Sequence, residues 1–157
     1  FLLKFNKGII LTDILIINGP NLNLLGTREP EIYGKESLND VENSLQKLAD
    51  DENISMSFMQ SNAEHQIIDS IQVAKKNSTK FIIINPGPLT HTSIALRDTF
   101  LGTQIPFIEI HISNIHKREE FRKKSFLSDL SVGVIVGLGV NGYSYAFMQA
   151  LKYIRSN

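Results

Sequence analysis

The 157-residue chain contains no cysteine. It therefore forms no disulfide and no thiolate metal site, and its composition gives no support to secretion. An excess of charge is also lacking, because 16 lysine and arginine residues balance 16 aspartate and glutamate residues. No uninterrupted apolar run approaches the ~20 residues that a membrane-spanning helix needs. We therefore expect neither nucleic acid nor a membrane among the partners of this protein.

Hydrophobic residues make up 42% of the chain, which is enough for the core of one compact domain. The stretch before residue 18 is apolar, but Lys4, Lys7 and Asp13 interrupt it, and no small-residue cleavage site follows. We expect an N-terminal extension or an extra strand over residues 1–12, a single domain over residues 13–157, and a cytoplasmic location.

Apolar periodicity divides the domain into alternating strands and helices. The predicted strands are residues 14–17, 54–59, 81–84, 106–112 and 132–136. The predicted helices are residues 38–51 behind a Ser37 cap, 63–77, a segment from a cap at Thr92 or Ser93 to about Leu101, 117–124 and 143–154. Three of the strands are apolar runs without alternation, which is typical of parallel strands covered on both faces. The sequence thus predicts an α/β fold, a flavodoxin-like doubly wound five-stranded parallel sheet with strand order 2-1-3-4-5.

Doubly wound sheets bind ligands beyond the carboxyl ends of their strands, at the switch point between the first and third strands. The chemically distinctive polar residues of this sequence follow such strand ends. They are Asn18, Asn21, Arg28 and Tyr33 after the first strand, Asn85, Thr90 and His91 after the third, and Glu109, His111 and Ser113 at the fourth. Scattered surface polarity would not converge in this way, so we expect the functional site at this edge.

Side chains alternate along the fourth strand, so Glu109 and His111 share one face while Ile108 and Ile110 share the other. A carboxylate and an imidazole buried on a central strand are costly unless they are paired. Pairing would hold the imidazole in one tautomer and favour its protonated form, which makes His111 a candidate general acid. The alternative is a buried ion pair with a structural role alone.

The loop after the first strand carries an amide, a cation and a phenol, in Asn21, Arg28 and Tyr33. A phenol with its ordinary pKa of ~10 is a poor base at neutral pH, and burial raises that pKa further. A nearby guanidinium lowers it, so we expect Arg28 to activate Tyr33 in a loop that closes over the site, with Gly26 and Gly34 as hinges. The alternative is a surface tyrosine packed on its own loop.

A carboxylate-binding site is predicted where the third strand leads into the next helix. Backbone N–H groups there, with Asn85 and Ser113 nearby, suit a carboxylate. Arg118 and Arg122, four residues apart on one face of the predicted helix, would add cationic contacts. A solvated basic face is the alternative for at least one of these arginines.

Two glycine motifs fail as nucleotide sites. Gly137 to Gly142 match the dinucleotide fingerprint, but they follow the last strand and no acidic residue comes about 20 positions later. We interpret them as a tight turn that packs a helix on a strand. Gly19 to Gly26 lack the Lys-Ser/Thr pair of a P-loop. The four histidines offer no metal-ligand spacing beyond Glu109 and His111, so no metal is expected.

Four stretches together resemble the type II 3-dehydroquinate dehydratases. They are NGPNLNLLGTREPEIYG from Asn18 to Gly34, LTHTSIALRD from Leu89 to Asp98, IEIHISN from Ile108 to Asn114, and GVIVGLG from Gly133 to Gly139. The similarity runs in consistent order from about residue 13 to residue 155, and several motifs together make it highly specific.

The resemblance implies a shikimate-pathway lyase of aromatic amino acid biosynthesis, which dehydrates 3-dehydroquinate through an enolate without metal or organic cofactor. It implies that Tyr33, as tyrosinate activated by Arg28, takes the C2 proton, and that Asn21 stabilises the enolate through a water. It implies that His111, oriented by Glu109, protonates the departing hydroxyl. It assigns substrate binding to Asn85, His91, Asp98, Ile112, Ser113 and Arg122. It also implies homo-oligomers, trimers that assemble into a dodecamer, with Asp98 reaching a neighbouring subunit's site.

One residue departs from the family pattern. Pro88 stands where the family usually has a small residue, and proline removes a backbone donor and stiffens the turn beside Asn85. Residues 1–12 have no counterpart in the family.

Three alternative functions fit the residues less well. The other type of dehydroquinate dehydratase forms a Schiff base from a lysine in a barrel, and no lysine ends a predicted strand here. A flavin- or nucleotide-binding module would depend on the rejected glycine motif. A receiver-like signalling domain needs an acidic cluster after the first strand, where Asn18 to Asn21 stand instead.

Overall fold

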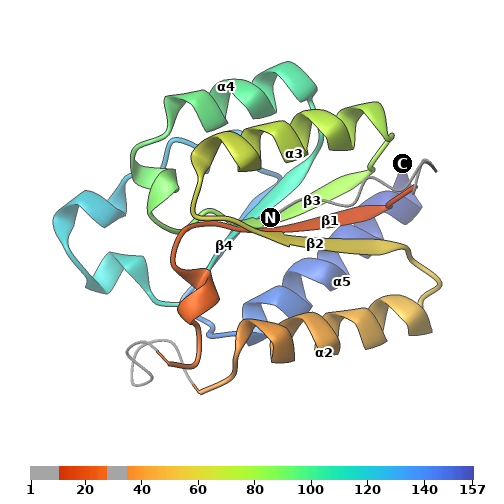
Figure 1. Cartoon of the computed structure of the whole chain (residues 1–157), viewed down its shortest axis with the longest axis horizontal. Helices are drawn as coiled ribbons and strands as arrows, with labels where there is room; N and C mark the ends of the chain where they lie inside the picture. Colours follow the sequence, from red (N-terminus) through yellow and green to blue (C-terminus); the bar gives the residue numbers. More distant parts are fainter. Residues whose placement is uncertain (1–10, 28–34) are drawn as a thin grey trace.

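The computed structural model describes residues 11–27 and 35–157. In this part of the chain, five parallel strands form one sheet in the order β2-β1-β3-β4-β5 (Figure 1). The strands are β1 (Ile14–Asn18), β2 (Met56–Gln60), β3 (Phe81–Asn85), β4 (Phe107–His111) and β5 (Gly133–Val136). The order confirms the predicted doubly wound, flavodoxin-like fold.

Helices cover both faces of the sheet (Figure 1). One layer contains α2 (Leu38–Asp51) and α5 (Asn141–Ser156), and the other contains α3 (Glu64–Lys76) and α4 (Ile94–Thr103). On β1, Ile14 and Ile16 pack into the α2–α5 layer while Leu15 and Ile17 pack into the α3–α4 layer. Both sets of side chains are buried, which is why the central strands are apolar without alternation.

Two serine caps begin helices, as the sequence predicts. The Ser37 side chain accepts a hydrogen bond from the Asp40 backbone N–H, and the Asp40 side chain accepts one from the Ser37 N–H, which completes a capping box. The Ser93 side chain accepts from the Leu96 N–H at 2.8 Å, so Ser93, not Thr92, caps α4.

The predicted helix over residues 117–124 is wrong. Two short 3-10 helices lie here instead, η3 (Ile115–Lys117) and η4 (Glu120–Lys123), and the backbone between them is extended at Arg118 and Glu119. A surface helix gains most of its stability by packing an apolar face, and Phe121, the large apolar residue of this charged segment, is 61% exposed. The other predicted boundaries lie within two residues of those observed.

The glycine-rich turn before α5 has the predicted structural role. Gly137 and Gly139 have φ angles of 81° and 63°, which favour glycine. A Cβ atom on Gly142 would lie 3.3 Å from Cγ2 of Ile135, so glycine lets α5 begin close against β5.

The predicted extension over residues 1–12 lies outside the described residues, apart from Leu11 and Thr12, and stays a prediction. Within residues 11–27 and 35–157, no helix combines the length and the apolar character needed to cross a bilayer.

Two loops at the carboxyl ends of β1 and β3 are in direct backbone contact. The Gly19 N–H donates to the Asn85 carbonyl oxygen at 2.8 Å. A Cβ atom on Gly19 would lie 2.3 Å from the carbonyl oxygen of Pro86, and one on Gly87 would lie 3.0 Å from that of Pro20. Glycine at both positions therefore lets the two loops interlock.

We predict that Gly19→Ala lowers the free energy of unfolding by about 1–3 kcal/mol or more, because the new methyl group overlaps a backbone carbonyl that cannot move freely. Urea denaturation followed by circular dichroism measures the change. Gly102→Ala is the matched control: its Cβ atom would have nothing within 4 Å, and alanine in α4 should stabilise the fold by up to ~1 kcal/mol. Equal unfolding midpoints for the two variants would contradict the interlocked loops.

Candidate active site

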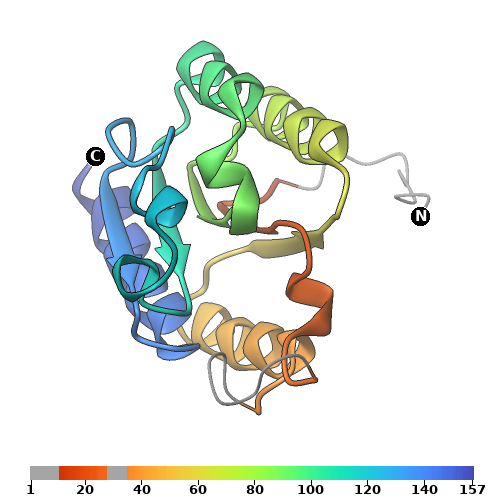
Figure 2. The same ribbon diagram turned by 90° about the vertical axis from the view of Figure 1, so that its left-hand side faces the viewer.

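A pocket opens at the carboxyl edge of the sheet, the side that faces the viewer in Figure 2. Its walls come from the loops after β1, β3 and β4. The predicted site residues that line it are Asn21, Asn85, His91, His111, Ile112, Ser113, Arg118 and Arg122. The structure thus brings eight of the predicted residues together, from segments about 100 positions apart in sequence.

Glu109 and His111 form the pair that the alternation on β4 predicts. His111 Nε2 lies 2.7 Å from Glu109 Oε1, and both residues are buried. Glu109 has no exposed surface, whereas His111 lines the pocket. A carboxylate accepts, so His111 donates through Nε2–H, which leaves Nδ1 as the ring nitrogen available to a bound molecule.

Three hydroxyl groups complete the surroundings of the Glu109 carboxylate. Thr90 Oγ1 donates to Oε1 at 2.6 Å, and Ser128 Oγ donates to Oε2 at 2.8 Å. Ser125 Oγ lies 3.0 Å from both carboxylate oxygens. Because Ser125 Oγ already accepts the backbone N–H groups of Leu127 and Ser128, its own proton is free to be donated.

This arrangement fits an ionised Glu109. Burial by itself raises the pKa of the Glu109 carboxyl, but the hydrogen bonds and charge of His111, together with the hydroxyls of Thr90 and Ser128, outweigh it and bring the pKa below its usual value. Each neighbour donates to the carboxylate, so a protonated carboxyl would have to displace one of these bonds. Glu109 therefore supplies a fixed negative charge behind His111.

His91 has a different environment from His111, although the rings stack with centroids 6.3 Å apart. His91 Nδ1 lies 2.7 Å from the Lys124 carbonyl oxygen, which only accepts, so Nδ1 carries a proton. Burial lowers the pKa of His91, and the positive charges of His111 and Arg122 lower it further. A neutral His91 thus presents Nε2 as an acceptor.

Asn21 lies at the start of η1 (Leu22–Leu24) with a φ angle of 71°. Its backbone N–H donates to Asn62 Oδ1 at 2.9 Å, and Gln60 Nε2 donates to the same oxygen at 3.1 Å. Gln60 Nε2 also lies 3.2 Å from the Gly19 carbonyl oxygen. Two side-chain amides, one on the last residue of β2 and one just after it, thus hold the loop that presents Asn21 to the pocket.

Both predicted arginines line the pocket, though not from one helical face. Arg118 Nη1 donates to Ser113 Oγ at 3.1 Å. Arg122 Nε lies 2.7 Å from Glu119 Oε2, and Arg118 Nε lies 3.7 Å from the same oxygen. The Glu119 carboxylate therefore brings the two guanidinium groups together. Hydrogen bonds from its own backbone N–H and from Arg122 lower the pKa of this carboxyl.

Pro88 also lines the pocket, in η2 (Gly87–His91). It stands in the first turn of this helix, where a backbone N–H has no partner within the helix, so the missing donor costs the helix no hydrogen bond. The departure from the family pattern is thus accommodated locally.

Of the predicted site residues that the structure describes, Glu109 and Asp98 do not line the pocket, and Glu109 lies behind His111. Asp98 is exposed on α4. Arg28 and Tyr33 lie outside the described residues.

Several groups that support the site cannot be identified from the sequence. The sequence places Thr90 at the correct edge but indicates no role for it, and it does not indicate Ser125, Ser128 or Tyr143 as site residues. Ser125 and Ser128 lie 16 and 19 positions from Glu109 in a loop without periodicity, so only the folded chain shows the contact. A short Ser-x-x-Ser spacing is too common to have identified them.

We predict that Glu109→Gln lowers the free energy of unfolding at neutral pH by about 3 kcal/mol and weakens its fall in acid. The folded pKa of Glu109 lies below the ordinary 4.5, so its ionisation stabilises the fold above that pH and the contribution is lost as the pH falls through the lowered pKa. Urea unfolding between neutral and acidic pH measures both effects.

Glu120→Gln is the control for this prediction. Glu120 is 86% exposed in its ion pair with Lys123, and such pairs contribute little. The wild type and Glu120→Gln should therefore share one pH dependence. A Glu109→Gln curve parallel to both would contradict a buried carboxylate that is held ionised.

Comparison with known proteins agrees with this geometry. The family model described as dehydroquinase class II matches residues 12–151. The 3-dehydroquinate dehydratase of Francisella tularensis subsp. novicida (strain U112) is 58% identical over 142 residues, which are 90% of this chain and 96% of that protein. The crystal structure of a type II dehydroquinase from Butyrivibrio crossotus DSM 2876 superposes with a TM-score of 0.86 at 46% identity, covering 88% of this chain and 97% of that one.

A type II dehydroquinase from Propionibacterium acnes gives a TM-score of 0.84 at 36% identity, over 90% of this chain and 98% of that one. The family model spans most of the chain, and the identities are far above what fold alone would give. By its sequence, its fold and the residues gathered at its strand ends, the chain belongs to the class II dehydroquinase family.

Proposed function

We propose that the pocket at the carboxyl edge of the sheet binds 3-dehydroquinate, and that Tyr33 and His111 carry out its dehydration. The overall reaction follows from the family: the chain is a type II 3-dehydroquinate dehydratase of the shikimate pathway, which forms 3-dehydroshikimate and water. The assignment of its residues to steps is our proposal.

In the first step, the Tyr33 phenolate removes a proton from the carbon beside the ketone. The electron pair of that C–H bond forms a double bond to the ketone carbon of the substrate, and the negative charge moves to the ketone oxygen. Asn21 helps to stabilise the resulting enolate. In the second step, the enolate re-forms the ketone while the neighbouring C–O bond breaks. His111 gives its proton to the departing hydroxyl, so water leaves and a conjugated enone remains. Return of the proton from Tyr33 to His111 through solvent restores the enzyme.

The pairing of His111 with Glu109 is the observation that carries this proposal. The two groups are 2.7 Å apart, Glu109 is held as a carboxylate by donors, and His111 borders the pocket. The carboxylate fixes the tautomer and the orientation of the imidazole, which leaves Nδ1 for a proton transfer with a molecule in the pocket. His91, neutral and bonded to a carbonyl, lacks this support.

Arg28 and Tyr33 are assigned from the sequence. Their loop begins beside the pocket, because Leu22, Leu24 and Leu25 line it. A guanidinium beside the phenol would lower its pKa and make it a usable base, as the sequence analysis argues.

The remaining lining groups suit the carboxylate and hydroxyls of the substrate. We assign them to Asn85, His91, Ile112, Ser113 and Arg122. Ser113 and Arg122 supply a hydroxyl and a guanidinium to the lining, and Asn85 lies at the switch point between β1 and β3. No metal or organic cofactor enters the proposed steps.

Asp98 is assigned to the active site of a neighbouring subunit in a trimer, with trimers assembled into a dodecamer. It lies on an exposed face of α4, four positions after Ile94 and three before Leu101, so the three side chains are neighbours on the helix surface. The side chains of Ile94 and Leu101 are 59% and 52% exposed. Exposed apolar side chains around a carboxylate suit a contact with another copy of the chain. Sedimentation of the purified enzyme as a monomer would contradict this assembly.

The domain limits at residues 13–157 and the cytoplasmic location stay predictions. Limited proteolysis tests the first, and fractionation of cells that express the protein tests the second.

We predict that Tyr33→Phe abolishes turnover but leaves substrate analogues bound, because only the proton-accepting oxygen is removed. Growth of the enone absorbance after addition of 3-dehydroquinate measures turnover, and calorimetry measures analogue binding. The wild type should keep its activity after treatment with a chelator. Turnover by Tyr33→Phe would remove Tyr33 as the base.

We predict that Arg28→Ala moves the acid limb of the pH–rate profile to higher pH. The limb reports the pKa of the base, and loss of the guanidinium lets that pKa rise towards its ordinary value of ~10. The shift should appear in kcat/KM measured over a range of pH with the enone assay. An unmoved limb would refute activation by Arg28.

A further inference from the structure

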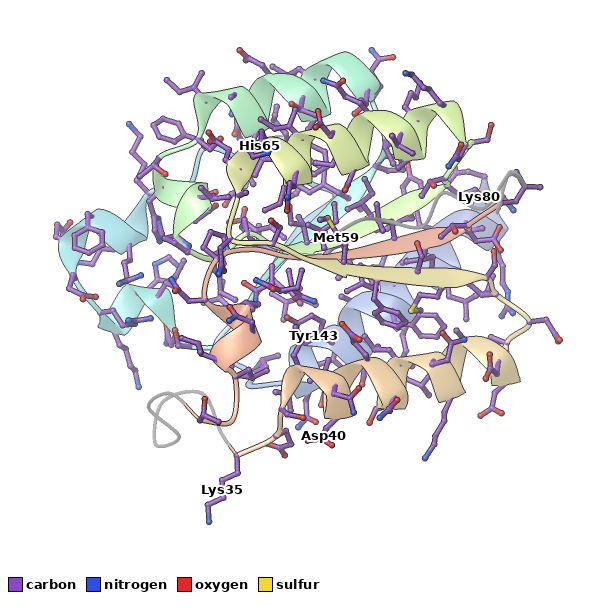
Figure 3. The ribbon with its side chains drawn as sticks, viewed as in Figure 1. Lys35, Asp40, Met59, His65, Lys80 and Tyr143 are labelled. Atoms are coloured by element: carbon purple, nitrogen blue, oxygen red, sulfur yellow. The ribbon has the colours of Figure 1, made fainter. Side chains whose placement is uncertain are left out.

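The hydroxyl of Tyr143 lies where strands β1 and β3 end, in the layer between the sheet and helices α2 and α5 (Figure 3). Tyr143 is 1% exposed. Its Oη donates to Asn18 Oδ1 at 2.5 Å and accepts from Asn85 Nδ2 at 3.2 Å. Asn18 and Asn85 are the last residues of their strands and are direct partners in the sheet register. One phenol therefore joins both strand ends at the switch point.

The backbone fixes the direction of each bond in this series. The Gly87 N–H can only donate, so the Asn85 Oδ1 atom, 3.3 Å away, faces it and Nδ2 faces Tyr143. Nδ2 can only donate, so the phenolic proton points to Asn18, whose Oδ1 accepts it. Burial raises the pKa of Tyr143, which keeps this proton on the phenol.

Asn85 is the member of the series that lines the pocket. An amide nitrogen has two hydrogens, and Tyr143 takes one of them, which leaves the second for a molecule in the pocket. If the amide turned over, its oxygen would take the place of this donor and would repel a carboxylate or an enolate. The orientation of one buried amide thus decides whether the substrate meets a donor or an acceptor.

We propose that Tyr143 is a positioning residue, which locks the Asn85 amide with its N–H group towards the substrate. The inference rests on the proposed role of Asn85 in substrate binding. Asn18 is the acceptor that completes the lock. Its Oδ1 atom accepts the Tyr143 hydroxyl, whereas its Nδ2 atom has no hydrogen-bond partner within the described residues.

Tyr143→Phe tests the lock, because phenylalanine keeps the buried ring and removes only the hydroxyl. We expect KM for 3-dehydroquinate to rise about tenfold while kcat falls by less than about twofold, since one oriented hydrogen bond is lost and the acid and base are untouched. Tyr153→Phe is the matched control on the same helix. Tyr153 packs edge-on against Phe81, and its hydroxyl makes no hydrogen bond to any described residue, so both constants should stay unchanged.

A double-mutant cycle with Asn85→Ala separates positioning from a general loss of structure. If Tyr143 acts through Asn85, adding Tyr143→Phe to an enzyme that already carries Asn85→Ala causes no further rise in KM. If the KM of the double variant instead rises by the product of the two single effects, the inference is overturned. An unchanged KM in Tyr143→Phe beside a raised KM in Asn85→Ala overturns it too, but leaves the proposed function standing. An unchanged KM in Asn85→Ala removes Asn85 from substrate binding, and the inference with it.

Discussion

A carboxylate with no exposed surface, that of Glu109, lies at the carboxyl edge of the sheet. Removing such a charge from water costs several kcal/mol, so it persists only where donors replace the lost hydration. Those donors come from β4 through His111, from η2 through Thr90, and from the loop after η4 through Ser125 and Ser128. Ser125 also accepts two backbone N–H groups of its own loop, so that loop folds around the charge. The path of three segments near the pocket thus depends on one buried ion.

The same loop explains why two neighbouring histidines differ. His111 has the carboxylate as its partner, whereas His91 bonds to the carbonyl of Lys124, the residue just before Ser125. The fold that surrounds Glu109 therefore also delivers the carbonyl that holds His91. The carboxylate holds His111 through Nε2 and the carbonyl holds His91 through Nδ1, so the two rings leave different nitrogen atoms available although they stack at 6.3 Å. The different orientations of the two rings therefore follow from a single loop path.

The fold was predictable because parallel strands covered on both faces must be apolar throughout, as in Phe81 to Ile84. The Glu109–His111 pair was predictable too, since alternation on one strand is a local property. The predicted helix over residues 117–124 was wrong, because a favourable spacing of charges does not supply the apolar face that stabilises a surface helix. Tyr143 and the serines were beyond reach for another reason: Tyr143 lies 125 positions from Asn18 and 58 from Asn85, and no local pattern reports such contacts. Sequence thus identified the groups placed on strand ends, and missed those that hold them in position.

These supporting groups reach the site from opposite layers of the fold. Glu109 and its hydroxyl donors lie on the face of β4 that packs with Phe107 towards α3 and α4, while Tyr143 rises from α5 on the other face. The hydrogen bonds around Glu109 and those around Tyr143 share no residue, and each ends on a different pocket group, His111 in one case and Asn85 in the other. A doubly wound sheet makes this division natural, because each strand end is within reach of both layers. The orientation of the His111 ring and that of the Asn85 amide can therefore be set independently, although both groups line one pocket.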